Sequence, residues 1–474
     1  MTSETYRAVL TRRSFLDTCA AGIGTLGLAQ LMGLEGILAA TASGGAAPQP
    51  HFAPKAKNLI FLFMAGAPSQ MDLFDPKPGL QKWHGQPLPP SMTADLKLAF
   101  IKPTAKVLAS PRSFSQCGQS RTEISDYLPN LQRVADDICL VRSMQTDQVN
   151  HHPGQSMLMS GSPLVGRPTI GSWLSYGLGS ESQNLPGFVV LSSGRGASGG
   201  SSNFSSGFLP SIHGGVPFRK TGDPILFLSN PAGVSRESQR LTLETLGKLN
   251  SEHLQRAGDP QIASRMANYE LAFRMQASAP ELIDFADESQ ATKDSYGVDE
   301  EPTSAYGTNC LMARRMVERG VRVVMLIHAS WDDHTNLDEG LKKNCDITDK
   351  PVAALVEDLK QRGLLDETLV VWGGEFGRTS LGQLKHVGDK VGRDHHPNGY
   401  SMWLAGGGIQ GGQVVGSTEE LALKVEEDPV HVHDLQATIL HLMGLDHERL
   451  TYRHMGRDFR LTDVSGNVVD RMLA

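Results

Sequence analysis

Three clusters of carboxylate and imidazole side chains give this sequence its clearest signs of chemistry. They are His151-His152, Asp332-Asp333-His334, and Glu375 together with Asp394-His395-His396. Each cluster lies just past a predicted strand or in the loop that follows one. Loops beyond the C-terminal ends of parallel strands are where α/β sheets place their ligands. The clusters therefore indicate a metal site or a proton-transfer site.

The spacing inside the clusters predicts which side chains act together. In an extended segment alternate side chains share a face, so Asp332 and His334 are expected on one side and the residue between them on the other. Asp394 and His396 are expected to pair in the same way, with His395 facing away. Such mixed oxygen and nitrogen donors suit zinc or manganese, and calcium is the less favoured alternative because it prefers oxygen ligands. One cluster alone could also be a solvated loop that caps itself, so the residues alone leave both interpretations open.

Apolar runs predict the strands that must position these clusters. The runs are residues 58–64, 138–141, 188–191, 321–327, 369–372 and 400–405. Helices are expected at 124–135, after Thr169, over most of 236–320, at 349–363 and at 433–443. The repeated order of strand, polar loop, helix and strand predicts an α/β fold, a doubly wound and mostly parallel sheet with helices on both faces.

Composition limits the classes of function. The chain has 474 residues, of which 39% are hydrophobic, and a formal net charge of −7. The negative charge argues against a broad basic surface, so nucleic acid is not an expected partner. Of the five cysteines, Cys19 lies in a presumed export signal and the others have no CxxC spacing, which argues against a structural zinc cluster.

The first residues predict an export signal. Thr11-Arg12-Arg13-Ser14-Phe15-Leu16 matches the twin-arginine pattern, and a weakly apolar run and small residues follow it. A signal peptide and linker are expected over residues 1–47, with the twin-arginine translocase as partner and a periplasmic or other extracytoplasmic location. The alternative is a cytosolic amphipathic helix. Residues 48–474 are expected to form one domain with loop insertions at about 192–215 and 236–320, and without a membrane span.

Seven segments together resemble the domain-of-unknown-function 1501 (DUF1501) family of exported proteins. They are FMAGAPSQMDLFDPKP, NHHPGQSMLMSG, GRPTIGSWLSYGLGS, WDDHTN, VVWGGEFGRTS, GRDHHPNGYSMWLAGGGIQGGQVVG and HDLQATILHLMGLD, and all of them lie within residues 58 to about 462. That family in turn resembles the alkaline phosphatase and sulfatase superfamily. The resemblance implies a doubly wound α/β sandwich with a metal site at the C-terminal edge of its sheet.

The superfamily resemblance extends to single positions. The place of the sulfatase nucleophile falls on His151, which could act as a phosphoryl acceptor, a general base or a metal ligand. The first-strand Asp-Asp ligands of sulfatases are replaced by Ala65-Gly66. Residues and resemblance together give two sets of candidates. The metal ligands are Asp332, Asp333, His334, Glu375, Asp394, His395 and His396, and the catalytic residues are His151, His152 and Arg378.

Two functions are compatible with these features. The first is an exported metal-dependent hydrolase that acts on a sulfate or phosphate ester, in a small molecule or a polysaccharide, with Arg378 steadying the anion. The alternative is a non-catalytic binding or scaffolding protein on a degenerate sulfatase fold. The missing serine, threonine or cysteine nucleophile favours the alternative, and the repeated metal-ligand pattern favours the hydrolase.

Overall fold

The computed structural model describes residues 49–93, 96, 98–219, 225, 228–231, 233–383 and 390–474. The predicted export signal and linker, residues 1–47, lie outside the described residues. Residues Gln49–Ala474 form one compact unit. Within the described part of the chain, none of the helices combines the length and the apolar character that crossing a bilayer requires.

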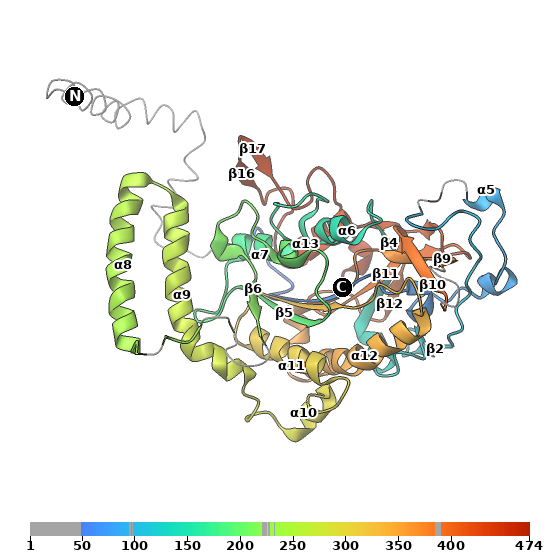
Figure 1. Ribbon diagram of the computed structural model, residues 1–474, viewed down its shortest axis with the longest axis horizontal. Helices are drawn as coiled ribbons and strands as arrows, with labels where there is room; N and C mark the ends of the chain where they lie inside the picture. Colours follow the sequence, from blue (N-terminus) through green and yellow to red (C-terminus); the bar gives the residue numbers. More distant parts are fainter. Residues whose placement is uncertain are drawn as a thin grey trace. The chain divides into compact units, whose positions relative to one another are not determined.

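A mostly parallel sheet forms the centre of this unit (Figure 1). Its strand order is β12-β4-β11-β8-β1-β7-β5-β6, with β15 also paired to β4. The bounds are β1 (Asn58–Ala65), β4 (Ile138–Gln145), β5 (Phe188–Gly194), β6 (Val216–Phe218), β7 (Val323–Ala329), β8 (Thr368–Gly373), β11 (Asn398–Ala405), β12 (Gln413–Val415) and β15 (Val430–His431). Within the described part of this central sheet, only β11 runs antiparallel to its neighbours, β4 and β8. The predicted α/β fold class is confirmed.

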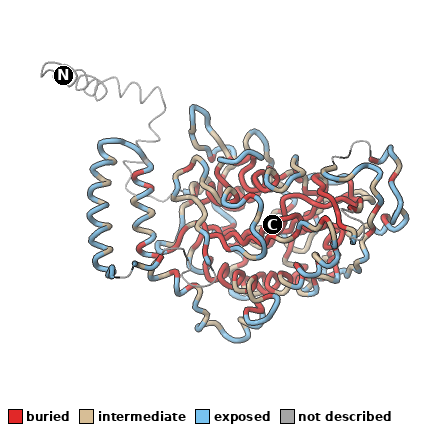
Figure 2. The backbone as a smooth tube through the Cα atoms, in the orientation of Figure 1, coloured by how far each residue is buried: buried red, intermediate tan, exposed pale blue. Residues whose placement is uncertain are grey.

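Helices cover both faces of the sheet (Figure 1). One face carries α6 (His151–Ser160), α7 (Ile170–Leu178) and α13 (Val432–Leu442), and the other carries α11 (Ser304–Glu318) and α12 (Leu337–Gln361). Strand β1 shows why both layers form, because all eight of its residues are buried. Leu59, Phe61 and Phe63 pack into one apolar cluster, and the alternate side chains pack into the other. Figure 2 shows the buried sheet between its more exposed covering layers.

Smaller elements attach to this core. Two-stranded sheets are formed by β9 (Gly377–Gln383) with β10 (Gly392–His396), β2 (Phe114–Cys117) with β3 (Thr122–Ser125), β13 (Ser417–Thr418) with β14 (Val425–Glu427), and β16 (Tyr452–His454) with β17 (Arg457–Phe459). The other α-helices are α4 (Gln70–Leu73), α5 (Pro90–Thr93), α8 (Arg236–Ala257), α9 (Pro260–Ile283) and α10 (Gln290–Tyr296). Figure 2 shows α8 exposed along its length, and none of its residues is buried.

Two helix predictions differ from the structure. The segment 124–135 was expected to be helical, but it begins in β3 and ends in a short 3-10 helix, Leu131–Asp137. Its apolar side chains are nevertheless buried, because Ile124, Leu128, Leu131 and Val134 all belong to one core cluster without forming a single helix face. The helix predicted at 349–363 is real but begins twelve residues earlier, at Leu337.

The sheet topology brings the polar clusters to one edge. Strands β1, β5, β7 and β8 are parallel neighbours, so their C-terminal ends lie together. Strand β4 is antiparallel to β11, as β8 is, so β4 ends at the same edge. The segments that follow β1, β4, β7 and β8 therefore converge, although they come from four distant parts of the chain.

Candidate metal centre

Four side chains from three of the predicted clusters meet at the C-terminal edge of the sheet. His151 is the first residue of α6, which follows β4. Asp332 and His334 stand in the loop between β7 and α12, and His395 lies on β10. One possible ligand atom from each of the four residues lies within 4.8 Å of the other three. The group is therefore of a size that could hold one metal ion.

Asp332 is the point on which the three imidazoles converge. Its Oδ1 atom lies 3.0 Å from Nε2 of His151, 2.9 Å from Nε2 of His334 and 3.4 Å from Nε2 of His395. The Asp332 side chain is 44% exposed, whereas those of His334 and His395 are buried. One carboxylate oxygen thus lies among three ring nitrogens on the solvent side of the group.

The other nitrogen of each ring is held by a hydrogen-bond acceptor. Nδ1 of His151 lies 2.7 Å from Oε1 of Glu375, Nδ1 of His334 lies 2.5 Å from Oε1 of Gln383, and Nδ1 of His395 lies 2.6 Å from the carbonyl oxygen of residue 149. An acceptor at Nδ1 requires the proton on that nitrogen, so in each neutral ring Nε2 keeps its lone pair. This second contact is the usual way in which proteins orient metal-binding histidines.

The charges of the group are strongly coupled. Burial raises the pKa of Asp332, but the three imidazoles and the guanidinium of Arg378 outweigh burial and bring that pKa well below its usual range. Burial lowers the pKa of His151, but its contacts with the carboxylates of Asp332 and Glu375 outweigh burial and raise that pKa to about 9. For His395, burial lowers the pKa overall. The Asp332 carboxylate is therefore ionised, and positive charge beside it stabilises this ionised form.

These residues fit a divalent metal ion. Nε2 of His151 is buried and has no hydrogen-bond partner, because its 3.0 Å contact with Asp332 lacks the geometry of a hydrogen bond. Without a bound cation, a proton on His151 and the guanidinium of Arg378 offset the charge of Asp332, and a metal ion would take the place of that proton between the ring nitrogens and the carboxylate. Three neutral imidazoles and one carboxylate are ligands that zinc and manganese accept.

Glu375 lies behind this group instead of in it, contrary to its prediction as a ligand. It is fully buried, and its oxygens accept hydrogen bonds from the backbone N–H of Gly66, from His151 and from Nε2 of Gln155. Glu375 therefore orients His151.

The tight turn at Gly66 needs glycine, because its φ is +111° and a Cβ there would lie 2.7 Å from the backbone nitrogen of Asp332.

Arg378 is also placed differently from its predicted role in binding an anion. Its guanidinium is 1% exposed and donates to the carbonyl oxygens of residues 66, 67, 331 and 393 and, at 2.7 Å, to Oδ1 of Asp332. Buried to this degree, the guanidinium is not accessible to a substrate. Arg378 instead ties together the loops that carry the group and fixes the Asp332 carboxylate.

Strand β10 turns the opposite residues toward the site from those expected. His395 joins the group, whereas Asp394 accepts hydrogen bonds from the backbone N–H groups of residues 99, 100 and 101. His396 faces the carbonyl oxygen of Leu423 at 2.9 Å. A β-bulge between Arg393 and His395 shifts the register against β9, and this shift cannot be read from an alternating pattern. The predicted pairing of Asp394 with His396 at the site is wrong.

The remaining predicted residues lie beside the group. His152 is exposed on the first turn of α6 and takes no part in it. Asp333 points away from its neighbours in the loop, and its Oδ2 atom is buried without a hydrogen-bond partner. Burial, reinforced by the Asp332 charge, raises the pKa of Asp333 to about 7.

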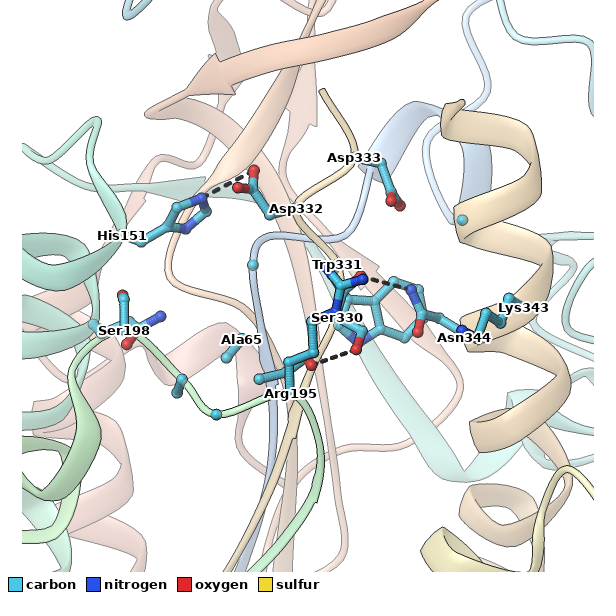
Figure 3. A pocket seen from close by; sticks show the side chains of 16 residues that line it. Ala65, His151, Arg195, Ser198, Ser330, Trp331, Asp332, Asp333, Lys343 and Asn344 are labelled. Carbon is cyan, nitrogen blue, oxygen red and sulfur yellow. Dashed lines mark hydrogen bonds and ion pairs between the residues drawn. The ribbon is translucent and has the colours of Figure 1, made fainter. Parts of the chain in front are cut away.

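A cavity of about 410 Å³ opens directly beside the group. Figure 3 shows His151 and Asp332 facing each other on its wall, with Asp333, Asn344 and Lys343 on the opposite side. Two cationic side chains, Arg195 and Lys343, also line it. Both are exposed, and neither forms a salt bridge within the described part of the chain.

Sequence reasoning missed the residues that support the group. Gln383 and Gln155 are buried amides in otherwise ordinary segments, and the acceptor for His395 is a backbone carbonyl. A single sequence carries no signal that distinguishes such groups from other buried polar residues. Arg195 lies in the glycine- and serine-rich segment 192–215, predicted as a loop insertion, and residues 195–198 of this segment line the cavity.

The chain belongs to the DUF1501 family, whose description is "protein of unknown function". The family's sequence profile matches residues 56–473. This match confirms the family that the seven sequence segments predicted. No curated protein matches the sequence.

Solved structures with a similar fold include sulfatases and phosphatases. A sulfatase from Pseudoalteromonas, PsFucS1, is 14% identical, with a TM-score of 0.37 over 88% of this chain and 72% of that chain. An alkaline phosphatase superfamily protein from Vibrio parahaemolyticus is 11% identical, with a TM-score of 0.34 over 84% and 69%. A TAB5 alkaline phosphatase variant with bound magnesium is also 11% identical, with a TM-score of 0.34 over 85% and 100%.

Proposed function

We propose that this protein is an exported, metal-dependent hydrolase that acts on a sulfate or phosphate ester. One observation carries the proposal: three imidazole Nε2 atoms and one carboxylate oxygen converge beside a cavity at the C-terminal edge of the sheet. Such a constellation on the wall of a cavity is a typical arrangement for metal-assisted hydrolysis.

His151, Asp332, His334 and His395 would hold the ion, and zinc or manganese suits this donor set better than calcium. A bound divalent ion supplies Lewis-acid polarisation of an ester oxygen and lowers the pKa of water. The protein's own part is to keep the three rings in the tautomer with Nε2 free, through Glu375, Gln383 and the backbone carbonyl of residue 149. Arg378 holds the carboxylate in place.

Two cationic side chains on the cavity wall support an anionic substrate. Arg195 and Lys343 line the same space as Asp332 and Asp333, and neither cation has a salt-bridge partner among the residues that the structure describes. Unpaired cations on the wall of a cavity attract and orient an anionic group. A sulfate or phosphate ester carries the negative charge that these side chains would meet, and the metal ion would add to the attraction.

The predicted twin-arginine signal supports export to the periplasm or another extracytoplasmic location, with the substrate encountered there. Sulfated or phosphorylated small molecules and polysaccharides both fit this proposal. Export can be tested separately, because replacing Arg12 and Arg13 with lysine should leave the protein inside the cell, as cell fractionation would show.

The decisive experiment compares metal content and turnover in one preparation. The protein, purified from its native compartment, should contain close to one zinc or manganese ion per chain and hydrolyse 4-nitrophenyl sulfate or 4-nitrophenyl phosphate. The double variant Asp332→Asn, His334→Ala should lose both properties. His253→Ala, an exposed histidine on α8, is the control and should keep both. Full turnover by the double variant would refute the proposal.

The alternative function, a binding or scaffolding protein, is favoured by one feature of the site. The position of the sulfatase nucleophile carries His151, whose ring is fixed between two carboxylates. A protein that binds one metal ion per chain but turns over neither class of ester would support this alternative.

A further inference from the structure

An exposed aromatic ring lies against the candidate metal centre and has no part in the function proposed above. Phe100 is 61% exposed, although burying a large aromatic side chain is favourable. Its ring centroid lies 5.5 Å from that of His334 and 5.4 Å from that of His395, with interplanar angles of 78° and 77°. The ring therefore rests on two of the four members of the group and leaves much of its surface open to solvent.

The loop under Phe100 is held by a buried carboxylate. Oδ2 of Asp394 accepts hydrogen bonds from three consecutive backbone N–H groups, those of Ala99, Phe100 and Ile101, at 3.1, 2.8 and 3.1 Å. Asp394 is fully buried. Three hydrogen bonds from consecutive backbone N–H groups to one side-chain oxygen together fix the local path of the loop.

The same strand fixes the ring and the metal centre relative to each other. Asp394 and His395 are consecutive residues of β10, and one holds the Phe100 loop while the other joins the group. Any substrate that reaches the centre beside His334 and His395 would meet the Phe100 ring. Phe100 does not line the cavity that carries Arg195 and Lys343, so the centre has a cationic side and an aromatic side.

We propose that Phe100 is a platform for the ring that bears the ester, and that Asp394 positions it. This inference rests on the proposed function and defines its substrate as an ester whose leaving group presents a flat hydrocarbon face. Both an aryl ring and a sugar ring have such a face, and each packs favourably on an aromatic side chain. In this arrangement the anionic group lies toward Arg195 and Lys343 and the leaving group lies toward Phe100.

A different role for Phe100 would be to shield His334 and His395 from water. The two roles predict different results. A shield affects metal affinity and every substrate equally, whereas a platform affects only those substrates that carry a ring. Substrates with and without a ring therefore separate the two roles.

The test measures kcat/KM of the metal-loaded protein for phenyl phosphate, α-glucose 1-phosphate and methyl phosphate. Phe100→Ala should lower kcat/KM by about threefold to tenfold for esters that carry a ring, mainly through KM, and leave methyl phosphate within about twofold. Phe100→Trp should retain wild-type values. The control is Phe52→Ala, because Phe52 also packs on a histidine, His441 at 5.0 Å, but lies away from the centre. Of phenyl phosphate and α-glucose 1-phosphate, the substrate whose kcat/KM falls further identifies the leaving group as an aryl ring or a sugar ring.

The positioning role of Asp394 has its own variants. Asp394→Ala should reproduce the ring-selective loss of Phe100→Ala with unchanged metal content, and Asp394→Asn, which keeps an acceptor oxygen, should restore much of the activity. An equal loss for all three substrates, or no loss in Phe100→Ala, would overturn the platform.

Binding measurements keep this inference separable from the proposed hydrolysis. Phenylphosphonate and methylphosphonate, which cannot be hydrolysed as esters, are titrated into the zinc-loaded protein by calorimetry. Phenylphosphonate should bind more tightly than methylphosphonate in the wild type, and Phe100→Ala should remove the difference. If the wild type turns over no ester but this difference is present, hydrolysis is refuted and the platform is supported. Equal affinities in the wild type would refute the platform.

Discussion

Two buried histidines at the same sheet edge have opposite surroundings. His328 is the penultimate residue of β7, four residues before Asp332, and is 2% exposed. Its Nδ1 lies 2.9 Å from the hydroxyl of Ser193 and its Nε2 lies 3.2 Å from Oδ1 of Asn344, so both nitrogens have neutral partners. His151 has a carboxylate near each nitrogen and an Nε2 atom without a hydrogen-bond partner.

The pKa values follow these partners. Burial lowers the pKa of His328 to about 4, whereas the carboxylates of Asp332 and Glu375 overcome burial and raise the pKa of His151 to about 9. The Asn344 amide donates to the carbonyl oxygen of Ser330, which leaves its own oxygen for His328 and completes the network. A histidine with both nitrogens satisfied supports the fold, and one that faces excess negative charge is prepared for a cation.

The largest expected difference between the two histidine environments is in metal content. His395→Ala removes one of four ligands and should reduce bound zinc or manganese from close to one ion per chain to a trace, as measured by mass spectrometry of the purified protein. His328→Gln should keep the metal. If the His328 variant also lost the metal while remaining folded, the two histidines would not have the separate roles assigned here.

A smaller effect is expected from the residues that orient the rings. Gln383→Leu removes the acceptor at Nδ1 of His334, and such partners typically change metal affinity by about 10- to 100-fold. Competition with a chelator of known affinity measures the change. Ser193→Ala, which removes the corresponding partner of His328, should leave metal affinity unchanged.

In contrast to metal content, the free energy of unfolding should depend on His328. His328→Leu leaves the Asn344 oxygen and the Ser193 hydroxyl without their partner, and an unsatisfied buried group costs about 1–3 kcal/mol of the free energy of unfolding. Urea denaturation of the metal-free protein measures this loss. His152→Ala, at an exposed position, should change the free energy of unfolding by less than about 0.5 kcal/mol.

The smallest effect concerns pH. Because the pKa of His328 is about 4 in the folded protein and 6.5 in the reference state, the unfolded chain binds more protons between these values. The contribution of His328 to the free energy of unfolding is therefore fully present above pH 6.5 and is lost as the pH drops toward 4. Between pH 7 and pH 6 this loss amounts to about 1 kcal/mol or less. Denaturation curves of the metal-free protein at several pH values should show a weaker dependence for His328→Leu than for the wild type.

The sheet was predictable because its strands are continuous apolar runs. Residues 58–64, 321–327 and 369–372 are buried on both faces, and such runs have few other uses in a chain of this composition. The segment 124–135 was misread because apolar residues three or four positions apart also occur in a strand followed by a turn. The first half of α12 was not predicted, because the many polar residues from Asp338 to Lys350 obscure the helical spacing of its few buried apolar side chains.

The site was predictable only as far as strand ends could be located. The loop after β7 supplies Asp332 and His334 together, as their spacing indicated. On β10 the choice between the two faces depends on a bulge and on contacts with residues 99–101, which are almost 300 positions away in the chain. Gln383, Arg195 and Phe100 carry no local signal, because their importance comes from what the fold places beside them.

The arrangement of β10 has a consequence for how this family could diversify. Arg393, Asp394 and His395 bind Asp72, the Phe100 loop and the metal group in turn, so the strand itself tolerates little change. Phe100, in contrast, is held by Asp394 through its backbone N–H, and its side chain packs on His334 and His395 while remaining largely exposed. If Phe100 acts as the platform proposed above, related proteins could change substrate preference by replacing this one side chain and keep the four residues of the candidate metal centre.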